Sequence, residues 1–224
     1  TLFAGCAVVP EQLTDSEVRE SAIETLAEFG DCGIVSQAVS TVRRMAEAEL
    51  AFFGLPLEKA TLDKPLNLAR GKTASLFAAA CAAPARAEGR SEEQDALETY
   101  GMALGMAFQL TDDLLDLGGD PARMGKPVCQ DVEEGKPTYP IVLLHDRLGE
   151  SDRAIFRSFF GRPIDPGERQ WILDRVYELG IIDYVRGTAE RYIEEALDAL
   201  EPFRESPCLR SMRIICKIVM DRDR

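Results

Sequence analysis

The stretch ETYGMALGMAFQLTDDLLD, residues 98–116, indicates a helical protein, because its small, apolar and acidic residues recur at helical spacing. Gly101 and Gly105 lie close to a single line along such a helix. The stretch therefore predicts a long helix whose carboxylates continue a small, apolar face and point into a cavity. Four polar residues share this face, at positions i, i+3, i+4 and i+7: Gln109, Asp112, Asp113 and Asp116.

Helical periodicity also dominates outside this stretch, and no sustained period-2 alternation indicates strands, so we predict an all-α fold. Pro84 with Gly89 is expected to close the third helix. The segment 118–137 is rich in glycine, proline and charge, and we expect it to be irregular and therefore functional. The expected helices cover about residues 14–30, 34–53, 66–82, 91–117, 138–148, 151–160, 167–179, 181–200 and 209–222.

The composition is typical of a globular protein, and we expect a single domain over residues 1–224. Hydrophobic residues make up 46% and charged residues 29% of the 224 positions. Acids outnumber bases by 39 to 26, so the formal net charge is −13. This balance disfavours nucleic acid or an anionic membrane as a partner, because both require cationic surface. No stretch reaches the roughly 18 to 20 apolar residues of a membrane span, so no integral membrane segment is expected.

The cysteine and histidine content argues against a zinc site. The six cysteines form no C-x-x-C pair, and the single histidine is His145. We interpret the cysteines as reduced, buried thiols of a cytoplasmic protein, and His145 as a surface or structural residue. The larger aromatic residues are assigned to the core: Phe52, Phe53, Phe77, Tyr100 and Trp171.

The aspartates at the end of the long helix are costly where they stand. Like charges at i+3 and i+4 repel, aspartate is a poor helix former, and negative charge in a last turn opposes the helix dipole. Asp112, Asp113 and Asp116 therefore require cations, and oxygen ligands without histidine suit Mg²⁺ or Mn²⁺. The alternative is a solvated acidic helix end, which an acidic protein would tolerate.

Lysines close to the acids add the parts that an organic diphosphate requires. Lys126 and Lys136 lie in the glycine-containing segments Gly125–Pro127 and Glu134–Thr138, just past the carboxylates. Lys72 lies inside an otherwise apolar helix, where it either extends to solvent or serves as a third phosphate-binding cation beside the hydroxyl of Thr73.

These motifs resemble the trans-isoprenyl diphosphate synthases, the polyprenyl synthetase family. The segment FQLTDDLLDLGGDPARMGKPVCQDVEEGKPTYP is similar to that family's second aspartate-rich region, and Gly71–Ala74 to its K-T-A segment. Tyr100-Gly101 with Leu104-Gly105 resembles the family's Y-G-x-x-L-G approach to the metal helix. The C-terminal residues 218–224 also resemble the family's last helix.

The resemblance implies an isoprenoid-synthase-type bundle of antiparallel helices around a central cavity, assembled as a homodimer. It implies an enzyme that condenses an allylic diphosphate with isopentenyl diphosphate. In such an enzyme Asp112, Asp113 and Asp116 would bind Mg²⁺, while Thr73 and Gln109 would line the reacting end and stabilise the allylic cation. The implied phosphate-binding residues are Lys72, Lys126 and Lys136.

The chain departs from the family pattern in one respect. The family's first aspartate-rich motif is absent from residues 1–224, so the resemblance covers about the C-terminal two-thirds of a member and its N-terminal helices are expected to be missing. Two explanations remain: a truncated or partly recorded enzyme, or a shortened noncatalytic, regulatory subunit of a heteromeric prenyl synthase. The intact second motif favours the enzyme. A related class I terpene cyclase is a third hypothesis, and the G-K-P and E-G-K-P-T segments argue against it.

Overall fold

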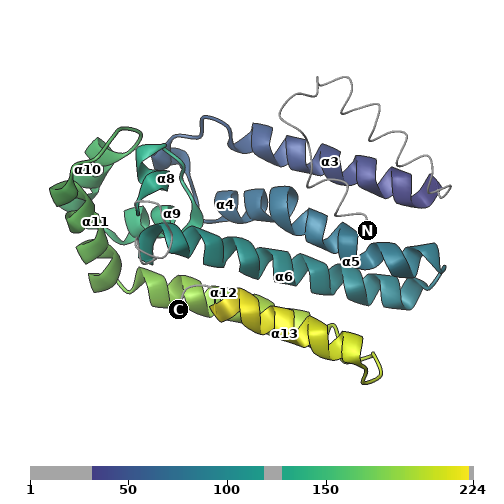
Figure 1. The fold of residues 1–224 in the computed structure, drawn as a ribbon. Helices are drawn as coiled ribbons and strands as arrows, with labels where there is room; N and C mark the ends of the chain where they lie inside the picture. The colour runs from purple at the N-terminus through teal and green to yellow at the C-terminus, as the bar shows by residue number, and fades with distance from the viewer. Residues whose placement is uncertain (1–31, 119–127, 222–224) are drawn as a thin grey trace, which may run out of the picture.

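The computed structural model describes residues 32–118 and 128–221, and over these residues it contains helices and no strand, which confirms the all-α prediction. Long helices lie side by side, and neighbours along the chain run in opposite directions (Figure 1). The helices are α3 (Cys32–Phe52), η1 (Leu57–Lys59), α4 (Asp63–Leu68), η2 (Ala69–Ala74), α5 (Ser75–Ala87), α6 (Ser91–Gly118), α8 (Gln130–Glu133), α9 (Tyr139–Arg147), α10 (Glu150–Phe159), α11 (Pro166–Glu178), α12 (Ile181–Asp198) and α13 (Pro207–Asp221).

The long helix α6 is the element around which the others assemble. It contacts α5, η2, α9, α12 and α13, and most of its inward side chains are fully buried. Tyr100 anchors its first half, because the phenol is buried and its hydroxyl donates a hydrogen bond to the carbonyl of Met212 in α13 at 3.0 Å. The short helices α8 to α11 gather near the C-terminal end of α6 (Figure 1).

Two glycines of α6 allow an unusually close approach to the preceding helix. A Cβ added at Gly101 would lie 2.5 Å from the carbonyl oxygen of Phe77, and one at Gly105 would lie 2.6 Å from the Cα of Ala74. Real Cβ atoms do not approach other heavy atoms so closely, and both contacts involve main chain that cannot rotate away. The backbone of α6 therefore packs directly on η2 and α5.

The third predicted helix differs from expectation. Residues 69–74 form a π-helix, η2, between α4 and α5, and Pro84 lies inside α5 instead of closing it. Pro84 removes one hydrogen bond without ending the helix, and α5 ends at Ala87, two residues before Gly89, whose φ is +67°. The predicted helix over residues 14–30 lies outside the described residues, as do residues 119–127 of the segment predicted to be irregular.

Tyr100, Phe77 and Trp171 lie in the core or pack against it as predicted, whereas Phe52 is only half-buried and the assignment of Phe53 is wrong. Phe77 stacks near Phe108, with ring centroids 5.4 Å apart, and Trp171 makes an edge contact with Phe159 at 5.6 Å. Phe53 is 86% exposed, because it follows the last residue of α3 and precedes the turn at Gly54. Cys81, Cys129, Cys208 and Cys216 are free thiols, and the expectation of buried cysteines is wrong for Cys208, which is exposed. None of the described helices is long and apolar enough to cross a membrane.

His145 is a structural residue, and the alternative that it lies at the surface is wrong. It is 6% exposed, and its Nε2 accepts a hydrogen bond from Nε of Arg157 at 3.1 Å. An accepting Nε2 places the ring proton on Nδ1 of a neutral imidazole. Burial, together with the charges of Arg157 and Arg153, lowers the pKa of His145 below its usual value.

We expect this buried imidazole to make the free energy of unfolding decrease as the pH is lowered. Below about pH 6.5 the unfolded chain gains a proton at His145 that the folded chain resists, so stability present above that pH is lost as the pH falls toward the lower folded pKa. His145→Gln keeps an acceptor for Arg157 but cannot titrate. Urea unfolding between about pH 7.5 and 5.5 should show a steeper loss for the wild type than for the variant, and parallel curves would contradict the assignment.

Candidate metal centre

The three aspartates at the end of α6 occupy three different environments. Asp112 is exposed, whereas Asp113 and Asp116 are half-buried. Asp113 accepts a hydrogen bond from Nε2 of Gln109, one turn earlier, at 2.9 Å. Gln109 and Asp113 therefore share a face as expected, whereas the exposed Asp112 does not point into the interior as the sequence predicted.

The π-helix η2 connects to this face through Thr73. The Thr73 hydroxyl donates to Oε1 of Gln109 at 2.7 Å, so a continuous chain of hydrogen bonds runs from Thr73 through Gln109 to Asp113. A π-helix has a wider turn than an α-helix and is frequent at functional sites. Here it places Thr73 against Gln109 of α6, whereas the neighbouring Lys72 pairs with Glu49 of α3. Thr73 and Gln109, the two residues predicted to line the reacting end, are therefore in direct contact.

Asp116 is held by the main chain of α8. Its Oδ1 accepts the N–H of Gln130 at 2.9 Å, and its Oδ2 accepts the N–H of Asp131 at 3.1 Å. The N–H of Cys129 also donates to the carbonyl of Asp116, at 2.6 Å, and Cys129 adopts a left-handed φ of +66° to make this turn. Residues 129–131 therefore lie against the end of α6, and the N–H groups of Gln130 and Asp131 fix both oxygens of the Asp116 carboxylate.

Asp131 is a fourth carboxylate of the site that helical spacing could not reveal. Burial raises the pKa of Asp131 to about 7, with further contributions from the charges of Asp116 and Asp112. Burial also raises the pKa of Asp113 to about 8, opposed by the hydrogen bond from Gln109 and reinforced by the charges of Asp131 and Asp112. Asp112, Asp113, Asp116 and Asp131 therefore form one group of interacting acids. The only indication of Asp131 in the sequence was its position after the helix, in a glycine-rich segment.

Two of the three predicted lysines lie among the described residues. Nζ of Lys136 is 2.5 Å from the carboxylate of Glu134, and Nζ of Lys72 is 2.8 Å from that of Glu49. Both lysine side chains are more than half exposed, so each pair contributes at most about 1 kcal/mol and can exchange for another anion. The pKa of Lys136 is raised, first by its hydrogen bond to Glu134 and also by Asp131 and Asp116. Lys126 lies outside the described residues.

The donor set of this site fits a hard divalent cation. All its candidate side-chain ligands are carboxylate oxygens, and burial, with a smaller contribution from neighbouring acids, raises the pKa values of Asp113 and Asp131, so a bound cation would stabilise their charged forms. Over residues 32–118 and 128–221, no three acidic, histidine or cysteine side chains converge as a preformed metal cage. An ion would therefore take one or two carboxylates and complete its shell with water and ligand oxygens, as Mg²⁺ commonly does.

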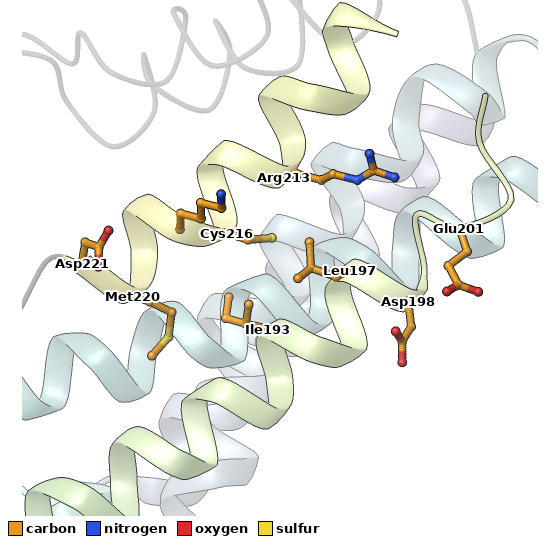
Figure 2. Close-up of a pocket in the computed structure, with 9 residues that line it drawn as sticks. Ile193, Leu197, Asp198, Glu201, Arg213, Cys216, Met220 and Asp221 are labelled. Atoms are coloured by element: carbon orange, nitrogen blue, oxygen red, sulfur yellow. The ribbon is translucent and has the colours of Figure 1, made fainter. Parts of the chain in front are cut away.

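A cavity lies away from these aspartates, on another part of the fold. It measures about 530 Å³ and lies between α12 and α13, with Ile193, Leu197, Cys216 and Met220 on its inner side (Figure 2). The charged residues at its rim do not include any acid of α6, and its Arg213 pairs with Glu205 at 2.8 Å. This cavity is therefore separate from the candidate metal centre.

Comparisons with known proteins agree with this geometry. A family model described as "Polyprenyl synthetase" matches residues 19–176. A short chain isoprenyl diphosphate synthase of Methanothermobacter thermautotrophicus is 31% identical over 90% of this chain, and an octaprenyl diphosphate synthase of Escherichia coli is 30% identical over 91%. The chain spans 64% of the length of each of these two relatives.

Solved structures agree as well. A decaprenyl diphosphate synthase from Rhodobacter capsulatus superposes with a TM-score of 0.85 at 26% identity, over 93% of this chain and 65% of the other. A polyprenyl synthase from Caulobacter crescentus, complexed with calcium and isoprenyl diphosphate, gives the same TM-score at 27% identity and the same coverage.

Proposed function

The chain belongs to the polyprenyl synthetase family, and from this premise we propose that the protein is a Mg²⁺-dependent trans-isoprenyl diphosphate synthase. It would condense an allylic diphosphate with isopentenyl diphosphate to make a longer trans-isoprenyl diphosphate. The observation that carries the proposal is the hydrogen-bonded chain from Thr73 through Gln109 to Asp113, which joins a hydroxyl, an amide and the carboxylate cluster in one place.

Each residue of the site has a role that its surroundings support. Asp112, Asp113 and Asp116 would hold Mg²⁺, which when bound neutralises charge on the diphosphate leaving group. Lys72, Lys126 and Lys136 would bind the phosphate oxygens, for which Lys72 and Lys136 would exchange the carboxylates of Glu49 and Glu134. No residue of this set is a strong nucleophile, which suits a reaction driven by positioning and electrostatic stabilisation.

Thr73 and Gln109 would act on the organic part of the substrate. The C–O bond of the allylic diphosphate breaks, and its electron pair leaves with the diphosphate. Because the Thr73 proton is directed to Gln109, the Thr73 oxygen keeps lone pairs that can face the resulting allylic cation. The double bond of isopentenyl diphosphate then attacks this cation, a C–C bond forms, and loss of a proton restores a double bond.

The test is an incorporation assay with the purified protein, labelled isopentenyl diphosphate, an allylic diphosphate and Mg²⁺. We expect label in a longer diphosphate, and no product when the metal is chelated. Cyclic hydrocarbon formed without incorporation would replace the proposal with a terpene cyclase. Absence of any product, with activity appearing only on addition of a catalytic subunit, would replace it with a regulatory subunit.

We further propose that the protein works in the cytoplasm as a homodimer. Both assignments rest on the family resemblance, and the cytoplasmic location rests also on the interpretation of the cysteines as reduced thiols. Light scattering of the purified protein should give the mass of two chains, and the mass of one chain would contradict the dimer.

A further inference from the structure

The helix α8 is too short to hold its own position. It has four residues, of which Val132 is buried, and a single turn of helix is not stable by itself. One end of α8 is attached to Asp116 by two N–H groups, as described above. The opposite side must therefore be fixed by contacts from elsewhere in the fold.

Those contacts come from α11 and the loop before it. One guanidinium nitrogen of Arg169 donates to the carbonyl of Val128, just before α8, and another donates to the Glu133 carboxylate, at the end of α8, at 3.1 Å. The same oxygen of Glu133 accepts the N–H of Ile164 at 3.0 Å. The N–H of Gly161 also donates to the carbonyl of Val132, at 2.8 Å. Arg169 thus spans α8 from one end to the other.

The burial of these groups makes the bridge more than a surface ion pair. The Arg169 side chain is 22% exposed and that of Glu133 is 25% exposed. A guanidinium group that donates to two separate acceptors fixes both their positions and their separation, which a lysine cannot do. Val128 is buried, and without Arg169 its carbonyl would lose this hydrogen bond.

From these contacts we propose that Arg169 is a positioning residue: it fixes α8, and the N–H groups of α8 then orient the carboxylate of Asp116 for metal binding. This inference rests on the proposed function, because it assigns a purpose to the orientation of Asp116. Arg169 itself belongs to α11 and contacts neither metal nor substrate in this scheme. Its effect passes through α8.

The sign of one measurement separates this role from simple electrostatics. Arg169 is a cation close to the acids, so if only its charge mattered, its removal would strengthen the binding of another cation. If it positions Asp116, its removal weakens that binding. A role in global stability alone would lower the unfolding temperature and leave metal affinity unchanged.

The experiment measures Mn²⁺ binding, by electron paramagnetic resonance of the free ion, in the wild type, Arg169→Ala and Arg169→Lys. Loss of an outer-shell partner typically weakens a metal site by about 10- to 100-fold, so we expect at least about a tenfold loss for Arg169→Ala. Arg169→Lys should recover only part of it, because it restores the charge without the two-pronged contact.

The matched control is Arg162→Ala. Arg162 also makes a two-pronged contact, with Glu168, in the loop just before α11, but it does not bridge α8. This variant should lose stability and keep the wild-type Mn²⁺ affinity. A second measurement, hydrogen exchange over residues 128–136, should show faster exchange in Arg169→Ala and no change in Arg162→Ala.

The outcomes distinguish this inference from the proposed function. If the wild type binds Mn²⁺ and Arg169→Ala binds it equally well or more tightly, only the positioning role is overturned. Unchanged exchange over residues 128–136 in Arg169→Ala would overturn it too. If the wild type binds no Mn²⁺, the metal site of the proposed function fails and the positioning role fails with it.

Discussion

Asp112→Ala is expected to reduce product formation by about 100- to 1,000-fold, the loss typical of removing one preorganised electrostatic group. Asp112 is the best of the three aspartates for this test because its side chain is exposed, whereas Asp116 also binds the main chain of α8. Helical content and the free energy of unfolding should stay close to the wild type, since Asp112 is exposed and negative charge near a helix C-terminus is itself unfavourable. Incorporation of labelled isopentenyl diphosphate, circular dichroism and urea unfolding check these expectations.

Asp95→Ala is the matched control for this prediction. Asp95 is an exposed aspartate of the same helix, α6, but it lies near the N-terminal end, far along the chain from the acidic cluster. Its replacement removes the same charge and should leave both incorporation and Mn²⁺ binding unchanged. Equal losses in the two variants would mean that net charge, and not a metal site at Asp112, explains the effect.

Gly101→Ala is expected to destabilise the fold by about 3 kcal/mol or more, at or beyond the upper end of the usual cost of overpacking. The added methyl would meet the carbonyl oxygen of Phe77 at 2.5 Å and the Cα of Ala78 at 2.7 Å. Main-chain atoms cannot change rotamer, so α5 and α6 must move apart along their whole contact. Urea or thermal unfolding measures the loss, and a stability equal to the wild type would show that the close approach is not real.

Gly187→Ala is expected to stabilise the fold, although it makes the same chemical change, also inside an α-helix. Gly187 lies inside α12, and a Cβ added there meets nothing within 4 Å. Alanine is a better helix former than glycine, so this variant should gain about 0.5 to 1 kcal/mol. The contrast between the two substitutions tests the helix contact itself, because the chemical change is identical.

Helix α6 illustrates what the sequence could predict. Its length follows from local spacing, and Gly101 and Gly105 pack against α5 and η2 as the pattern indicated, whereas Asp112 is exposed. The later helices were also placed correctly, because each is bounded by glycine, proline or a cap that acts within a few residues. Periodicity carries this information because the helix repeats the same geometry along the chain.

Other features depended on contacts between distant residues. The contribution of Asp131 and the bridging contact of Arg169 require that residues 128–133 return to α6 and α11, and no local spacing encodes that return. The π-helix η2 was missed because its hydrogen bonds span only one residue more than those of an α-helix, within a sequence that suits both. The roles assigned to the individual site residues stay predictions until the experiments above are made.

The direct contact between α6 and the preceding helix has a consequence for mutational screening. The contact at Gly105 involves Ala74, which follows Thr73, so it sets the register in which Thr73 meets Gln109. A screen that scores product alone would rank Gly101 and Gly105 beside the aspartates, although neither glycine has a functional group. Scoring cellular abundance in parallel would separate the two classes, since glycine variants should disappear from the pool of soluble protein while Asp112 variants should accumulate at normal levels.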